Sequence, residues 1–115
     1  MTEEAKFQKK IITYMESIGA FVTKFNASGI SKTGVPDLLM CYKGRYLALE
    51  VKKESGTISD IQQWNLNQIR KAGGEAVCIK PSDFEEFKKH IIEEEYFMIR
   101  KLCERNEKEI TKLVS

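Results

Sequence analysis

The stretch GVPDLLMCYKGRYLALEVKK, residues 34–53, constrains the fold most, because it has the pattern of two apolar strands joined by a tight Lys-Gly turn. With a two-residue turn, Tyr42 pairs with Arg45 and, further along the hairpin, Asp37 pairs with Glu50. Directly paired side chains point to the same face, about 4.5–5.5 Å apart at Cβ. A four-residue loop keeps this register, whereas an odd-length loop without a bulge does not. The hairpin therefore predicts two carboxylates facing each other.

Two facing carboxylates repel, so either one of them is protonated or a cation lies between them. Both are hard oxygen ligands, and Mg²⁺ held by one or two carboxylates keeps waters for a substrate phosphate and a nucleophile. Lys52 stands one step along the same face, where it can neutralise a phosphate oxygen or orient the attacking water. The triplet predicts metal-assisted phosphodiester hydrolysis. The alternative is an ion pair of Lys52 with either Asp37 or Glu50 on a solvated sheet face.

The rest of the chain predicts helices and short strands in alternation. We expect a helix up to Gly19, a strand over 20–26, a small-residue loop over 27–34, the hairpin, a helix over 59–72, a strand over 75–80, a helix from Pro81 and a helix over 96–114. This order predicts an α/β fold with a mixed sheet flanked by helices.

Composition indicates one globular domain, since 42% of the 115 residues are hydrophobic and 31% are charged. No apolar run reaches the roughly 20 residues of a membrane span, and the N-terminus lacks the apolar region of a secretory signal. Three well-separated cysteines are typical of reduced core residues, so we expect a cytoplasmic protein. Residues 1–53 hold nine Lys/Arg and five Asp/Glu, which favours an anionic partner such as nucleic acid, although ordinary solvated surface is the alternative.

Three short motifs, taken together, resemble the PD-(D/E)XK nuclease superfamily and, within it, the VRR-NUC domain that occurs alone in phages and fused in DNA-repair nucleases. They are Gly34-Val-Pro-Asp37, Glu50-Val51-Lys52 and Ser59-x-x-Gln62, and the resemblance covers residues 4 to 80. It implies a restriction-endonuclease-like mixed sheet. We therefore expect a nuclease domain over residues 1–95 and a C-terminal helical extension over 96–115.

The resemblance also implies roles for individual residues. Asp37, Glu50 and the backbone carbonyl of Val51 would be ligands of Mg²⁺ or Mn²⁺, and Lys52 would lie beside the attacking water. The helix-one acid of the family matches Glu4, with Glu3 as the alternative. Glu4 also shares a helical stripe with apolar core positions, although an acid in a first turn is favoured by the helix dipole in any case.

Gln62 has two interpretations. Ser59 and Gln62 spell a capping box, in which Gln62 bonds back to the Ser59 amide. The resemblance instead implies that the Gln62 side chain lies in the active site, near metal-bound water or the scissile phosphate. The capping role and the active-site role are compatible. Candidate DNA contacts lie in or near the preceding glycine-containing loop, where phosphate can approach the backbone closely: Lys24, Ser28, Lys32 and Gly34.

The leading hypothesis is a metal-dependent DNA endonuclease, structure-selective for a four-way (Holliday) junction or other branched DNA, in the cytoplasm of a bacterial or phage-infected host cell. The resemblance implies in-line attack of water, leaving 5′-phosphate and 3′-hydroxyl. The alternative is a non-catalytic nucleic-acid-binding or partner-binding α/β module with a vestigial site. A nucleotide-cradling phosphotransferase is disfavoured because no Walker-type glycine loop is present.

We also expect a homodimer. The C-terminal helix carries apolar residues at helical spacing that the nuclease core does not require: Met98, Ile99, Leu102, Cys103, Ile110, Leu113 and Val114. An isolated helix of this length is marginal in water, so its stripe needs a partner surface. Two-fold symmetry would also supply two sites for cutting both strands of a branched DNA. The alternative is that the stripe packs on its own sheet.

Overall fold

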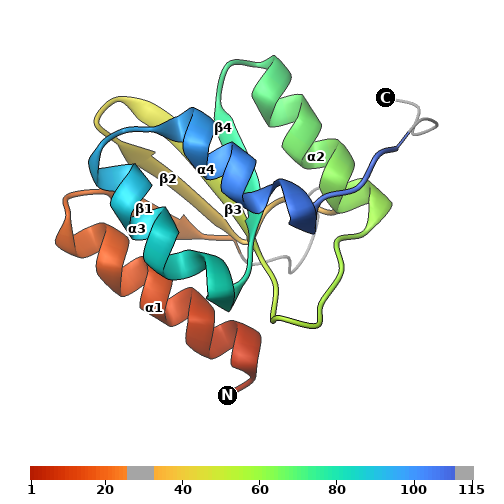
Figure 1. The fold of residues 1–115 in the computed structure, drawn as a ribbon, viewed down its shortest axis with the longest axis horizontal. Coiled ribbons are helices and arrows are strands. Elements are labelled where there is room, and N and C mark those ends of the chain that lie inside the picture. The colour runs from red at the N-terminus through yellow and green to blue at the C-terminus, as the bar shows by residue number, and fades with distance from the viewer. Residues whose placement is uncertain (26–32, 111–115) are drawn as a thin grey trace.

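The computed structural model describes residues 1–25 and 33–110, which form a four-stranded sheet with helices on both faces (Figure 1). The strands lie in chain order across the sheet: β1 (Phe21–Lys24), β2 (Leu38–Tyr42), β3 (Arg45–Val51) and β4 (Glu75–Ile79). The first three are antiparallel neighbours, and β4 is parallel to β3. The predicted α/β fold with a mixed sheet is confirmed.

The β2–β3 hairpin has the predicted register, with Leu38 opposite Leu49 and Tyr42 opposite Arg45. Lys43 and Gly44 both adopt left-handed backbone, at φ 50° and 80°. Two successive left-handed residues are the signature of a type I′ turn, whose twist matches that of the flanking strands. The register places Asp37 immediately before β2, beside the end of β3.

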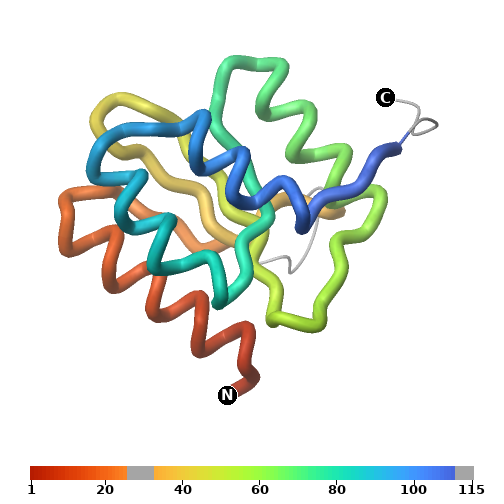
Figure 2. Tube along the Cα trace, viewed as in Figure 1, coloured from red at the N-terminus to blue at the C-terminus, as the bar shows by residue number. Residues whose placement is uncertain are grey.

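Helices cover the sheet unequally. One face carries α1 (Glu3–Ser17), α3 (Phe84–Ile92) and α4 (Tyr96–Cys103), whereas α2 (Asp60–Lys71) packs on the other face (Figure 2). The main core lies under the three helices and includes fully buried side chains from every layer: Ile11, Met15, Leu38, Leu47, Leu49, Phe87, Ile91 and Ile99. The second, smaller core joins Ala48 and Cys78 of the sheet to Leu66 of α2. Small side chains on this face let α2 approach the strands closely.

The helix predicted over 96–114 ends at Cys103, so the prediction is wrong for residues 104–110. The chain makes a 3₁₀ turn at Glu104–Asn106 and then runs without regular structure to residue 110, while Leu113 and Val114 lie outside the described residues. The Asn106 amide donates to the Cys78 carbonyl and to Asp83, both at 2.8 Å. These hydrogen bonds to residues far away in the chain hold Asn106 in place of further turns of helix.

Of the predicted apolar stripe, Ile99 and Cys103 are buried inside the same molecule at 1% and 0% exposure, Leu102 is half-buried and Met98 is 41% exposed. Packing on the chain's own sheet, the alternative considered above, is therefore what the structure shows for Ile99 and Cys103. The division of the chain after residue 95 remains a proposal, and α4 contributes to the same core as α1 and α3. Within the described residues, no helix is both long enough and apolar enough to cross a membrane.

Candidate active site

Asp37 is held from both sides at the end of the sheet. Its backbone carbonyl accepts a hydrogen bond from the Phe25 nitrogen at 2.8 Å, and its side-chain Oδ2 accepts one from the Val51 nitrogen at 2.8 Å. The aspartate therefore bridges the β1 side and the β3 side at the point where ladder pairing ends. These bonds fix its carboxylate beside Glu50.

Glu50 lies near the end of β3 and is only 2% exposed. Burial, together with the neighbouring Asp37 charge, raises the pKa of its carboxyl group to about 9. In the part of the chain that the structure describes, Glu50 Oε1 is buried and has no hydrogen-bond partner. A buried acceptor without a partner is costly, so this oxygen is suited to an incoming ligand.

Lys52 follows directly after β3, and its Nζ lies 3.9 Å from Glu50 Oε2. Its side chain is only 14% exposed, so the amine is turned toward the carboxylates instead of solvent. The structure thus brings Asp37, Glu50 and Lys52 together, as the hairpin register predicted. The contact is longer than a charge-assisted hydrogen bond, and it lies in a buried site instead of on the solvated sheet face of the ion-pair alternative.

The donor set fits Mg²⁺ or Mn²⁺. Two adjacent carboxylates, one with a buried oxygen that has no partner among the described residues, are hard ligands whose mutual repulsion a cation would relieve. Within residues 1–25 and 33–110, no three His, Cys, Asp or Glu side chains form a metal-holding group by themselves. Water and substrate phosphate would have to complete the coordination, as is usual for Mg²⁺. The Val51 carbonyl and Glu4 remain predicted ligands.

Glu4 lies in the first turn of α1 and is partly buried, whereas Glu3 is exposed. The Glu4 charge contributes to raising the pKa of Glu50, which favours Glu4 over Glu3 as the acid that faces the site. One turn later, Gln8 is 9% exposed, and its Oε1 is buried without a hydrogen-bond partner in the described segments. Gln8 was not among the predicted site residues, although a glutamine within an apolar helical stripe is a visible signal.

Gln62 makes the predicted capping box at the start of α2. Its side-chain Oε1 accepts a hydrogen bond from the Ser59 backbone nitrogen at 2.9 Å, and its backbone nitrogen donates one to Ser59 Oγ at 3.2 Å. The Nε2 group has no hydrogen-bond partner among the described residues and is the part that can donate to a substrate. Since α2 covers the sheet face on which Ala48 and, by alternation, Glu50 stand, the capping and catalytic roles remain compatible.

The predicted DNA contacts fare differently. Lys24 is exposed but pairs with Leu38, so the alternation of β1 places it on the opposite sheet face from Asp37. Gly34 has φ +79°, and a Cβ there would meet Ile61 Cγ1 at 2.9 Å, so the glycine is required for packing against α2. Ser28 and Lys32 lie outside the described residues. DNA binding by these four residues stays a prediction.

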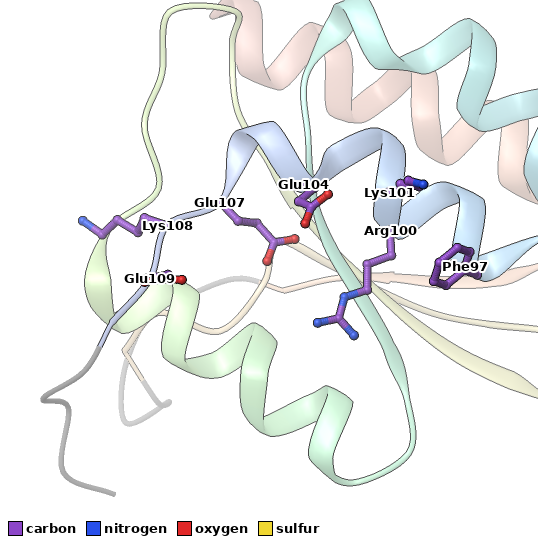
Figure 3. A pocket seen from close by; sticks show the side chains of 7 residues that line it. All are labelled: Phe97, Arg100, Lys101, Glu104, Glu107, Lys108 and Glu109. Carbon is purple, nitrogen blue, oxygen red and sulfur yellow. The ribbon is translucent and has the colours of Figure 1, made fainter.

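A hollow of about 500 Å³ lies elsewhere, beside α4 and the segment that follows it. Figure 3 shows the side chains that line it: Phe97, Arg100, Lys101, Glu104, Glu107, Lys108 and Glu109. Its three basic and three acidic side chains offset each other, and none of the predicted site residues is among them. The hollow is therefore distinct from the carboxylate site.

Comparisons with known proteins point to a nuclease fold. No family model and no curated protein matches the chain. A solved structure described as a VRR_NUC domain is 29% identical with a TM-score of 0.65, and the match covers 80% of this chain and 97% of that one. Archaeoglobus fulgidus Hjc, described as a Holliday junction resolvase from an archaeal hyperthermophile, is 23% identical with a TM-score of 0.52 over 67% of this chain and 69% of that one. The second likeness is one of fold alone.

Proposed function

The chain has the PD-(D/E)XK-like nuclease fold of the VRR-NUC domain, and from this premise we propose that it is a metal-dependent DNA endonuclease. One observation carries the proposal. Asp37 and Glu50 lie side by side at the end of the sheet, and Lys52 is 3.9 Å from Glu50. Two hard carboxylates and one amine form a minimal set for phosphodiester hydrolysis.

Each of these residues has a distinct task. Asp37 and Glu50 would hold Mg²⁺ or Mn²⁺, which would stabilise the negative charge of the scissile phosphate and lower the pKa of water. Lys52 donates to a non-bridging phosphate oxygen or orients the attacking water. The water oxygen forms a bond to phosphorus as the bond from phosphorus to the 3′-oxygen breaks. The water releases a proton to solvent, the 3′-oxygen takes one up, and the products are 5′-phosphate and 3′-hydroxyl.

We further propose that the substrate is branched DNA and that the enzyme acts as a homodimer. The fold likeness to a protein described as a Holliday junction resolvase supports the choice of branched DNA. A two-fold axis would present two sites to the two strands of a branch. Because Ile99 and Cys103 are buried in the core, an interface on this helix has to use its exposed apolar side chains, Phe97 and Met98.

A panel of DNAs tests the proposal. Four-way junction, flap, nicked, linear duplex and single-stranded DNAs are incubated with Mg²⁺ or Mn²⁺, and the Glu50→Gln protein is the control. We expect cleavage of branched DNA in preference to linear duplex, with ligatable 5′-phosphate ends and no product in chelator or with Glu50→Gln. Binding without cleavage of any DNA in either metal would reject the enzyme and favour the non-catalytic binding module.

A further inference from the structure

The outer surface between α1 and α3 forms a groove of about 690 Å³ on the helical face of the sheet. The two helices lie side by side (Figure 1), and Phe84 at the start of α3 packs edge-on against Phe7 and Tyr14 of α1. Lysine and hydroxyl side chains surround a largely apolar floor that includes two aromatic rings: Met1, Lys6, Lys9, Lys10, Thr13, Tyr14, Ser17, Phe84, Glu85 and Lys88.

The charge of this groove is one-sided. Four lysines line it against a single acid, Glu85, which is already paired with Lys88 at 2.9 Å. Among the described residues, Lys6, Lys9 and Lys10 form no ion pair, and all three are exposed. In contrast to the balanced hollow beside α4, the groove therefore has an uncompensated positive potential, as expected for a surface that binds an anionic polymer.

The basic side chains follow one stripe of α1. Lys6, Lys9 and Lys10 are spaced by three and four residues, and the hydroxyl residues Thr13 and Ser17 continue the same line. The fifteen residues of α1 span about 22 Å, the length of six or seven base pairs of duplex. The helix begins beside Glu4, whose charge reaches Glu50, so the stripe leads away from the candidate active site.

The aromatic floor favours duplex over single-stranded DNA. Lys88 Nζ lies 4.8 Å from the centre of the Phe84 ring and 5.5 Å from that of Tyr14, so the amine covers both rings. Phe84 is only 8% exposed and packs edge-on against Tyr14 at 5.9 Å. Single-stranded sites stack bases on open aromatic faces, which these rings do not offer. The groove offers charge and hydroxyl groups, which suit backbone phosphates.

We propose that the α1–α3 groove binds the backbone phosphates of a double-stranded DNA arm that extends from the cleaved bond. The inference rests on the proposed nuclease function and assigns Lys6, Lys9 and Lys10 as phosphate contacts outside the active site. These contacts carry no sequence information, so they would hold any duplex arm of sufficient length.

The test compares two triple variants in the Glu50→Gln protein, which prevents cleavage. The groove variant is Lys6→Ala, Lys9→Ala and Lys10→Ala. The matched control is Lys43→Ala, Lys71→Ala and Lys101→Ala, which removes the same charge from exposed lysines elsewhere. Fluorescence anisotropy is measured at several salt concentrations with a duplex of 20 base pairs and with a single strand of 20 nucleotides, and circular dichroism checks folding.

For the 20-base-pair arm we expect the groove variant to lose roughly tenfold in affinity and its slope of log K against log salt to shrink by about 2.7, since each duplex phosphate contact contributes about 0.9. A triple Lys→Arg variant should bind like the parent. The control variant should lose much less.

Two outcomes would overturn the inference: equal affinities of the groove and control variants for the long duplex, or an equal loss with single-stranded DNA. Either outcome leaves the nuclease proposal standing if the wild-type protein cuts DNA. A wild-type protein that neither binds nor cuts any DNA fails the nuclease proposal itself, so the two failures are distinguishable.

Discussion

The side chain of Asp37 accepts a hydrogen bond from the backbone nitrogen of Val51, at 2.8 Å, across the end of the β2–β3 hairpin. The strand that carries Glu50 therefore also orients the second carboxylate. An amide at position 37 has an oxygen that can accept the same bond, whereas a methyl group cannot. Asparagine is thus the substitution that separates the charge of this residue from its structural role.

We expect Asp37→Asn to fold normally and to lose cleavage by at least about a hundredfold, because one of the two proposed anionic ligands of the metal is gone. DNA affinity should be unchanged or higher, since no basic contact is lost and one charge that repels phosphate is removed. Single-turnover cleavage and anisotropy measure the two effects separately. Glu50→Gln should behave alike, and wild-type cleavage by Glu50→Gln with Mg²⁺ would contradict the mechanism.

Lys52→Ala should lose most activity and still bind Mn²⁺. In the proposed mechanism the amine acts on phosphate or water and the carboxylates hold the metal, so calorimetric Mn²⁺ binding should survive. Lys52→Arg keeps the charge and serves as the matched control. Loss of Mn²⁺ binding in a folded Lys52→Ala protein would show that the lysine has been given the wrong role.

The raised pKa of Glu50 predicts a pH-dependent stability in the metal-free protein. The folded pKa of about 9 lies above the ordinary value of 4.5, so the folded state holds a proton that the unfolded chain releases. Stability from this group is complete below pH 4.5 and is lost as pH rises toward 9, by at most about 1.4 kcal/mol per pH unit. Urea denaturation from pH 5 to 9 should show this decline, and Glu50→Gln should abolish it. Parallel curves for the two proteins would contradict the prediction.

The hairpin could be predicted from sequence because its information is local. Alternating apolar residues and one left-handed Lys-Gly turn fix the register, and the register alone brings Asp37 to Glu50. The burial of Gln8 and the influence of Glu4 on Glu50 depend on how α1 packs on the sheet, which no local pattern specifies.

The C-terminal segment could not be predicted in the same way. Helical spacing continues past Cys103, but Asn106 finds its partners at Cys78 and Asp83, far away in the chain. Glu107 likewise accepts bonds from Gln63 and Arg70. These long-range hydrogen bonds favour the end of the helix at Cys103, and the spacing of apolar residues in the sequence does not predict them.

Glu107→Gln should destabilise the fold by about 1–3 kcal/mol. The Glu107 carboxylate accepts from Arg70 Nη1 at 2.7 Å and from Gln63 Nε2 at 3.0 Å, with both charged side chains largely buried. Arg70 also donates to the Ala76 carbonyl of β4 at 2.9 Å, so the Arg70–Glu107 pair also holds the arginine against β4. Glu109→Gln, at an exposed site two residues on, is the control. Equal denaturation midpoints for the two variants would contradict the assignment.

Point substitutions on α4 test the proposed dimer better than removal of the C-terminal segment. Deletion of residues 96–115 would remove Ile99 and Cys103 from the core, so loss of dimer would be confused with loss of fold. Phe97 and Met98 are 74% and 41% exposed, and changing both to serine leaves the buried side of α4 intact. If the homodimer uses this helix, light scattering at micromolar concentration should report a dimer for the wild-type protein and a monomer for Phe97→Ser with Met98→Ser.

Phe21→Ser is the matched control for this experiment, because Phe21 is also 74% exposed but lies on β1, opposite Cys41. By alternation this side chain stands on the other sheet face from α4. We expect the control to remain dimeric, since removing an exposed apolar side chain outside the interface costs no contact between subunits. A monomer mass for the wild-type protein rejects the dimer altogether. If the double variant stays dimeric and Phe21→Ser is monomeric, the interface instead lies on the exposed face of β1 that carries Phe21.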